Sequence, residues 1–174
     1  MLRVAHTSEL EPALLDELHA MLVEAFDGTF EATDWEHALG GMHAIAYEDG
    51  ELVGHASVVQ RRLLHGGRAL RAGYVEGVGV RRAARRRGHA GALMDAIERV
   101  IRGAYEVGAL GASDEAIPFY RARGWQPWAG ETFALTPDGR VRTPEDDDAL
   151  YVLELPAAKL DRTAEIACDW REGA

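Results

Sequence analysis

The sequence is short of cysteine, of long apolar runs and of net positive charge. Cys168 is the single cysteine among 174 residues, so we expect no internal disulfide and no thiolate metal site. No run approaches the roughly 20 apolar residues of a membrane span. The formal net charge of −10 argues against nucleic acid, whose phosphates require a broad basic face. These absences predict a cytoplasmic protein with neither a membrane nor a nucleic-acid partner.

What is present is enough apolar material for a core, because 47% of the residues are hydrophobic. No internal repeat or low-complexity linker interrupts the chain, and we expect a single domain over residues 1–174. Hydrophobic periodicity and turn residues predict an α+β fold, with a mixed, mostly antiparallel sheet flanked by helices. The expected strands are Leu2–His6, His43–Tyr47, Leu52–Leu64, Leu70–Val80, Tyr105–Leu110, Trp125–Leu135 and Leu150–Leu155.

The expected helices alternate with these strands. The first begins either at Ser8, where Glu11 would complete a capping box, or at Pro12. A short helix is expected over Asp34–Leu39, and another follows Gly88. The last is expected to be capped by Ser113 and to end at Gly124.

One short segment runs against the acidic balance of the chain. Residues 81–87 contain five arginines and lead through Gly88 into an amphipathic helix. A glycine turn at a helix start exposes unpaired N–H groups and a positive dipole end, which suit a pyrophosphate. Taken alone, the segment fits a solvated charge run equally well. The preceding strand YVEGVGV favours a ligand site, because Gly77 and Gly79 interrupt it.

The motifs resemble those of a known enzyme family. The run Arg85–Ala90, RRRGHA, matches the acetyl-CoA loop of the GNAT superfamily of N-acetyltransferases, and IPFY with a later GW resembles its second signature. Further segments resemble the aminoglycoside 2′-N-acetyltransferases in the same order along the chain. These segments are DWEHALGGMHA, RAGYVEGVGV, RGAYEVGAL, RTPEDDDA and CDWREG.

The resemblance implies the GNAT fold, acetyl-CoA as donor, an aminoglycoside 2′-amine as acceptor, antibiotic resistance as the outcome and a homodimer. Glu76 is the candidate base that deprotonates the substrate ammonium, and Tyr120 the candidate acid for the departing thiolate. Outside this family context, Tyr120 would be interpreted as a core tyrosine and Glu76 as a surface carboxylate. The expected donor-binding residues are Val78, Gly79, Val80, Arg85, Arg86, Arg87, Gly88, His89, Ala90 and Gly91.

The acceptor residues follow from the resemblance and from charge, since carboxylates pair well with ammonium groups. The expected set is Asp34, Glu76, Gly77, Gly111, Asp146 and Asp147. Thr29 stands where relatives have an acidic residue, and Gly111 where they have a serine. The terminal CDWREGA also lacks two residues of the family's aromatic tail, whose carboxylate reaches the acceptor. We therefore expect a weaker hold on the remote rings of the substrate.

Two other functions stay open at this stage. One is acetylation of a different amine, such as another aminocyclitol antibiotic, a polyamine or a peptide terminus. The other is a non-catalytic acyl-CoA-binding module, which retention of Glu76 and Tyr120 disfavours. The histidines His43, His55 and His89 show no metal-ligand spacing and are interpreted as core or surface residues, so no metal is expected. The tryptophans Trp35, Trp125, Trp128 and Trp170 are interpreted as core or interface anchors.

Overall fold

A computed structural model describes residues 1–169, which form two compact units. The first unit contains residues 1–59 and 75–100, and the second contains residues 60–74 and 101–169. The chain passes between them within strands β3 (Glu51–His65) and β4 (Arg68–Val80) and within helix α3 (His89–Ala104). No helix among these residues is long and apolar enough to cross a membrane. The strands of each unit carry or adjoin many of its candidate site residues.

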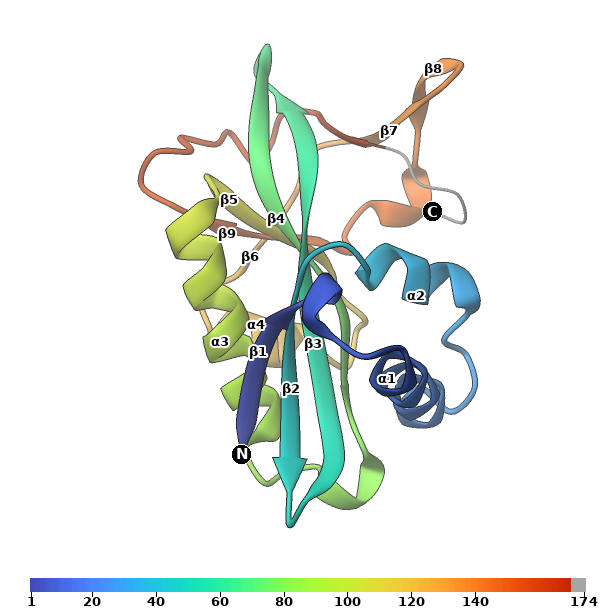
Figure 1. The fold of residues 1–174 in the computed structure, drawn as a ribbon. Helices are drawn as coiled ribbons and strands as arrows, with labels where there is room; N and C mark the ends of the chain where they lie inside the picture. The colour runs from blue at the N-terminus through green and yellow to red at the C-terminus, as the bar shows by residue number, and fades with distance from the viewer. Residues whose placement is uncertain (170–174) are drawn as a thin grey trace. The chain divides into compact units, whose positions relative to one another are not determined.

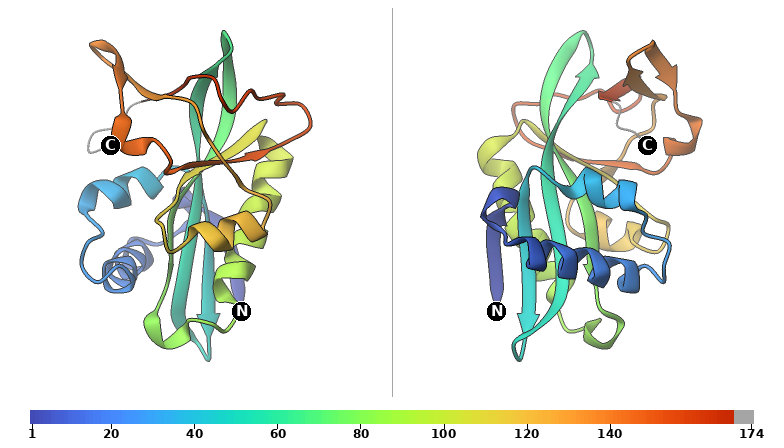
Figure 2. Two further views of the ribbon diagram at one scale, coloured as in Figure 1. Left: turned by 180° about the vertical axis from the view of Figure 1, so that it is seen from behind. Right: turned by 45° about the vertical axis from the view of Figure 1, so that its right-hand side comes forward.

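The first unit contains three adjacent antiparallel strands, β1 (Leu2–His6), β2 (Met42–Glu48) and the first part of β3. Helices α1 (Pro12–Ala25) and α2 (Ala32–Ala38) cover one face of these strands, and α3 covers the other (Figures 1 and 2). Successive residues of β3 therefore face different helices. A Cβ built at Gly54 would lie 3.1 Å from Leu93 of α3, whereas the ring of the next residue, His55, lies against Trp35 of α2.

Helix α1 begins at Pro12, so of the two predicted starts the one at Ser8 is wrong. Residues Thr7–Glu9 form a 3-10 turn, η1, instead. The His6 N–H donates to the Glu9 carboxylate at 2.7 Å, which closes that turn before the helix begins. Proline at the first helical position loses no hydrogen bond, because that N–H has no partner within a helix.

The second unit contains most of the strands. Their order is β6 (Gln126–Pro127), β9 (Leu150–Glu154), β5 (Val107–Gly111), β4, β3, β10 (Ile166–Asp169), β7 (Thr132–Thr136) and β8 (Gly139–Arg142). The β4–β5 and β10–β7 pairs are parallel, and the β5–β9, β6–β9, β7–β8 and β10–β3 pairs are antiparallel. Helix α4 (Ile117–Ala122) follows β5, and turns η2 (Arg82–Ala84) and η3 (Pro144–Asp146) complete the described elements. The mixed, mostly antiparallel pattern expected from the sequence is confirmed.

Two local predictions in this unit are wrong. The expected strand Trp125–Leu135 is divided into β6 and β7, because the N–H groups of Ala129 and Gly130 bond to the Arg162 carbonyl. Ser113 does not cap α4 with its side chain. The Ser113 carbonyl instead accepts N–H bonds from Ala116 and Ile117, in the turn that precedes the helix.

Candidate functional site

The candidate base Glu76 lies half-buried on β4, next to a left-handed residue, Gly77, with φ of 55°. Side chains of β3 bond to the carbonyls of these two residues. The Ser57 hydroxyl donates to the Glu76 carbonyl at 3.2 Å, and His55 Nδ1 bonds to the Gly77 carbonyl at 2.8 Å. The backbone that carries Glu76 is therefore held by two neighbouring side chains of the same strand face.

The end of β4 passes under α1. A Cβ built at Gly79 would lie 2.7 Å from Leu22 Cδ2 and 3.4 Å from Ala25 Cβ, so a side chain there would force the buried Leu22 to shift. Val78 and Val80 flank Gly79 and are half-buried. This part of the candidate donor site is thus supported from one side by α1.

The first turn of α3 offers donors for an anion. The first helical bond runs from the Ala92 N–H to the Gly88 carbonyl at 3.0 Å, so the N–H groups of His89, Ala90 and Gly91 have no helical acceptor. Gly88 has φ of 87°, and a Cβ built there meets no atom within 4 Å. An open, positively polarised turn of this kind fits a pyrophosphate.

Three arginines of the loop contact the last turn of α1 and the loop that follows it. The pairs are Arg81 with the Glu24 carboxylate, Arg82 with the Asp27 carboxylate at 2.8 Å, and Arg85 with the Ala25 carbonyl at 2.6 Å. A helix C-terminus carries partial negative charge and unpaired carbonyls, so these cations stabilise it. Part of the arginine cluster therefore serves the fold of the first unit.

The other two arginines differ in their surroundings. Arg87 forms an ion pair with Glu48 at 2.9 Å, and His89 Nε2 lies 3.6 Å from the same carboxylate. Arg86 is exposed, adopts φ of 61°, and has no ion pair within residues 1–169. Arg86 is consequently the loop cation that can meet an outer phosphate without breaking a contact.

The candidate acid Tyr120 lies on α4 and is 6% exposed. Its ring meets that of Trp125 edge-on, with centroids 6.1 Å apart. Burial raises the pKa of Tyr120 to about 12, because the phenolate would lose its hydration. The hydroxyl therefore keeps its proton throughout the physiological range.

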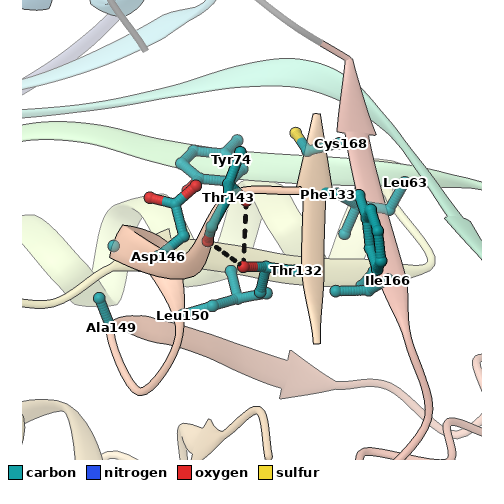
Figure 3. Close-up of a pocket in the computed structure, with 11 residues that line it drawn as sticks. Leu63, Tyr74, Thr132, Phe133, Thr143, Asp146, Ala149, Leu150, Ile166 and Cys168 are labelled. Carbon is teal, nitrogen blue, oxygen red and sulfur yellow. Dashed lines mark hydrogen bonds between the residues drawn. The ribbon is translucent and has the colours of Figure 1, made fainter. Parts of the chain in front are cut away.

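A small pocket, open to solvent, lies in the second unit (Figure 3). Its lining includes Tyr74, Gly111, Thr132, Thr143, Asp146 and Cys168. Two expected acceptor residues, Gly111 and Asp146, thus line the same pocket. Although Asp146 as a residue is exposed, partial burial of its carboxylate raises its pKa, and a Thr143 hydrogen bond opposes that effect.

The adjacent Asp147 has a different environment. Its carboxylate pairs with the Arg142 guanidinium through both oxygens and accepts hydrogen bonds from the N–H and hydroxyl of Thr132. The Arg142 hydrogen bond, followed by those from Thr132, lowers the pKa of Asp147 to about 2. Its charge is already balanced within the loop, whereas Asp146 faces the pocket.

The remaining acceptor features lie near α2 or outside the described residues. The Asp34 carboxylate accepts the Glu31 N–H at 2.7 Å and so caps the start of α2. The Thr29 hydroxyl donates to the Phe26 carbonyl at 2.7 Å, just after α1. The tail, including Trp170 and the expected loss of its carboxylate contact, lies outside residues 1–169.

Sequence reasoning missed several residues of these sites. Tyr74, Thr132 and Thr143 line the pocket, although none of them was expected as a site residue. Tyr74 and Thr143 lie within the family-like segments RAGYVEGVGV and RTPEDDDA, and Thr132 lies in neither. His43 and His55 are core residues, one of the two alternatives expected for them, but the sequence did not indicate that they bond to each other and, through His55, to Gly77. Among the described residues, no group of three or more His, Cys, Asp or Glu is arranged to hold a metal ion.

Comparison with known proteins decides the family. The model of the acetyltransferase (GNAT) domain matches residues 6–128. An aminoglycoside 2′-N-acetyltransferase from Mycolicibacterium fortuitum is 56% identical over 174 residues, covering 98% of this chain and 89% of that protein. The chain belongs to the aminoglycoside 2′-N-acetyltransferase family of the GNAT superfamily. The family predicted from the sequence motifs is thereby confirmed.

Solved structures of other GNAT proteins share the fold of this acetyltransferase. Escherichia coli YhbS, crystallised with CoA, superposes with a TM-score of 0.69 at 17% identity, covering 99% of this chain and 89% of that one. Eis1 from Mycobacterium abscessus has a TM-score of 0.62 at 26% identity, covering 75% of this chain and 32% of that one. The match thus spans about a third of the longer Eis1 chain. The predicted GNAT fold is confirmed.

Proposed function

We propose that this enzyme transfers the acetyl group of acetyl-CoA to the 2′-amine of an aminoglycoside or related amino sugar. The observation that carries the proposal is 56% identity, over nearly the whole chain, to an aminoglycoside 2′-N-acetyltransferase. The open turn of α3 and the pocket that contains Asp146 and Gly111 are consistent with the anionic donor and cationic acceptor. Acetylation removes a positive charge from the antibiotic, which is how the reaction would confer resistance.

The donor is assigned to β4 and the turn that follows it. The N–H groups of Val78 and Val80 would hold the pantetheine arm and thioester, and those of His89–Gly91 the pyrophosphate. Gly88 leaves room for that approach, since no atom lies within 4 Å of a Cβ built there. Arg86 would meet an outer phosphate, with Arg85, Arg87 and His89 at the edges of the site. Acetyl-CoA supplies the activated acetyl thioester when bound.

Proton transfers are assigned to Glu76 and Tyr120. Glu76 would accept a proton from the substrate ammonium, directly or through one water, and so free the lone pair of the amine. Tyr120 would donate its phenolic proton to the departing sulfur. Its pKa, raised by burial to about 12, keeps that proton in place at neutral pH. Both proton transfers are therefore assigned to side chains of this chain.

The acceptor is assigned chiefly to the pocket that contains Asp146 and Gly111. Asp146 would pair with an ammonium group of the amino sugar. Asp34, Glu76 and Gly77 stay acceptor residues that the family resemblance implies. Asp147, expected from the sequence to share this role, would act by holding the loop through Arg142. Because Thr29 replaces an acidic residue, one carboxylate that could pair with a substrate ammonium group is missing. Loss of one exposed ion pair weakens binding by about 0.5–1 kcal/mol.

A panel assay tests the proposal. Acetyl-CoA turnover is measured with 2′-amino aminoglycosides, other aminocyclitols, polyamines and peptides, and NMR assigns the acetylated nitrogen. We expect acetylation of the 2′-amine. Modification of a 3- or 6′-amine would refute the regiochemistry, and turnover of only non-sugar amines would refute the substrate class. CoA binding without any turnover would favour the non-catalytic alternative.

The assembly and cellular location stay predictions of the sequence. We propose a homodimer, which the resemblance to the family implies, and a cytoplasmic enzyme. Sedimentation equilibrium at micromolar concentration should return twice the chain mass. A monomer mass across the whole concentration range would remove the dimer.

A further inference from the structure

A continuous string of hydrogen bonds crosses the first unit and ends at the candidate catalytic strand. Thr7 Oγ1 lies 2.7 Å from His43 Nε2, and His43 Nδ1 lies 2.8 Å from His55 Nε2. His55 Nδ1 then lies 2.8 Å from the Gly77 carbonyl oxygen. The string thus links η1, β2, β3 and β4 through four side-chain or backbone groups.

The proton on each bond follows from chemistry. A carbonyl oxygen only accepts, so His55 Nδ1 must carry a hydrogen and donate to Gly77. In a neutral imidazole the other nitrogen then accepts, which requires His43 Nδ1 to donate to His55 Nε2. By the same argument the Thr7 hydroxyl donates to His43 Nε2 at 2.7 Å, in preference to the Gly41 carbonyl at 3.2 Å. Both imidazoles therefore have the Nδ1–H tautomer, and each bond contains one proton.

The surroundings keep both imidazoles neutral. His43 and His55 are fully buried, and the Trp35 ring lies against both, with centroids 6.3 and 5.9 Å away. Burial lowers the pKa of His43 to about 4 and that of His55 to about 3. His6, at the cap of η1, lowers the pKa of His43 further. Two neutral rings without a counter-charge indicate a structural string rather than an ion pair.

The end of the string determines what it can do. Gly77 has φ of 55°, in the left-handed region, and directly follows Glu76. A carbonyl oxygen cannot pass a proton onward, so the string is not a proton pathway to the base. It can, however, fix the peptide plane that contains the Gly77 carbonyl, because the donor at His55 Nδ1 is held in turn by His43 and Thr7.

We propose that His55, oriented by His43 and Thr7, is a positioning residue that sets the direction of Glu76 by anchoring the Gly77 carbonyl. The inference rests on the proposed function, in which Glu76 accepts the substrate proton. A small displacement of a catalytic group from its productive geometry can lower the rate on the order of 10²-fold. Loss of the anchor should therefore lower kcat much more than it raises the KM for acetyl-CoA.

Two substitutions separate the two ends of the His55 ring. The amide of asparagine can place a donor near the former Nδ1, whereas that of glutamine reaches the former Nε2 position. His55→Asn should therefore keep the anchor and lose the bond to His43, and His55→Gln the reverse. We expect kcat to fall about 10–100-fold in His55→Gln, with partial rescue in His55→Asn. Equal kcat losses in the two variants, at temperatures where both are folded, would overturn the proposal.

A measurement on the unaltered protein does not depend on the folding of any variant. Long-range ¹⁵N–¹H NMR of the histidine rings distinguishes the two tautomers. At neutral pH we expect Nδ1–H for both His43 and His55, and an Nε2–H signal from either ring would refute the string. Glu76→Gln, assayed in parallel, tests separately whether Glu76 is the base. Full activity in Glu76→Gln would reject the base, and with it the catalytic use of the anchor, while the tautomer result would still stand.

Discussion

At the scale of single residues, the environment of Tyr120 determines how it can serve as an acid. The side chain is buried on α4, and burial raises its pKa to about 12. Tyr120→Phe keeps the ring and removes the proton donor, so we expect kcat to fall roughly 10²–10⁴-fold. Tyr151→Phe is the matched control, since Tyr151 is equally buried and its hydroxyl accepts one long bond of 3.3 Å from Arg121. Wild-type kcat in Tyr120→Phe, with chemistry rate-limiting, would exclude the acid role.

Gly111 offers a second test at this scale, where the chain departs from its relatives. A Cβ built at Gly111 meets only the Tyr74 hydroxyl, at 4.0 Å, so a serine fits without strain. Because Gly111 lines the pocket with Asp146, the new hydroxyl should add a hydrogen bond to the amino sugar. We expect Gly111→Ser to lower the KM of the acceptor severalfold. Gly103→Ser on α3 serves as the control, and an unchanged KM would place the acceptor away from Gly111.

At the scale of elements, the turn between β4 and α3 combines two demands on Gly88. Its φ of 87° strains any other residue, and the open space beside it is where the donor is proposed to lie. Gly88→Val should therefore weaken CoA binding by at least tenfold in calorimetric titration. Gly66→Val is the control, because Gly66 also has positive φ, 57°, and no neighbour within 4 Å. Equal CoA affinity in a folded Gly88→Val protein would contradict the donor assignment.

Elements with strong periodicity or clear turn residues were predictable. The expected strands His43–Tyr47 and Leu52–Leu64 correspond to β2 and β3, and Pro12 offered the correct start of α1. The short strands β8 and β10 were missed, because four residues with little alternation leave no periodic signal. The break between β6 and β7 depends on contact with a distant segment, at Arg162 and Ala164. Pairing of that kind is tertiary and has no local sequence signal.

The candidate site residues show the same difference between features with a local sequence signal and features that depend on tertiary contacts. Donor and catalytic candidates could be proposed from the sequence, because the glycine-arginine loop and the tyrosine motif are contiguous in it. The different environments of Asp146 and Asp147 were not predictable, since they depend on Arg142 and Thr132 in neighbouring strands. The string from Thr7 to Gly77 likewise joins residues from four elements. Only the fold brings such groups together.

At the scale of the whole molecule, buried neutral histidines make stability depend on pH. Burial lowers the pKa of His43 to about 4 and of His55 to about 3, whereas an unfolded histidine titrates near 6.5. As the pH falls below about 6.5, these two imidazoles therefore bind protons in the unfolded chain but stay neutral in the folded chain. The stabilisation is complete above that pH and is lost progressively toward pH 4 and below. Asp147 adds a separate loss of stability at lower pH, as the pH falls through its unfolded pKa near 3.8 toward its folded pKa of about 2.

Urea denaturation between about pH 7.5 and 4.5 measures this dependence. Each imidazole should contribute a slope of up to about 1.4 kcal/mol per pH unit once the pH is well below 6.5. In His55→Asn one titrating group is gone, so the free energy of unfolding should fall less steeply with acid, even if the variant is less stable at neutral pH. A slope that is identical in wild type and His55→Asn would mean that His55 titrates in the folded protein as it does in the unfolded chain, which would contradict its burial as a neutral ring.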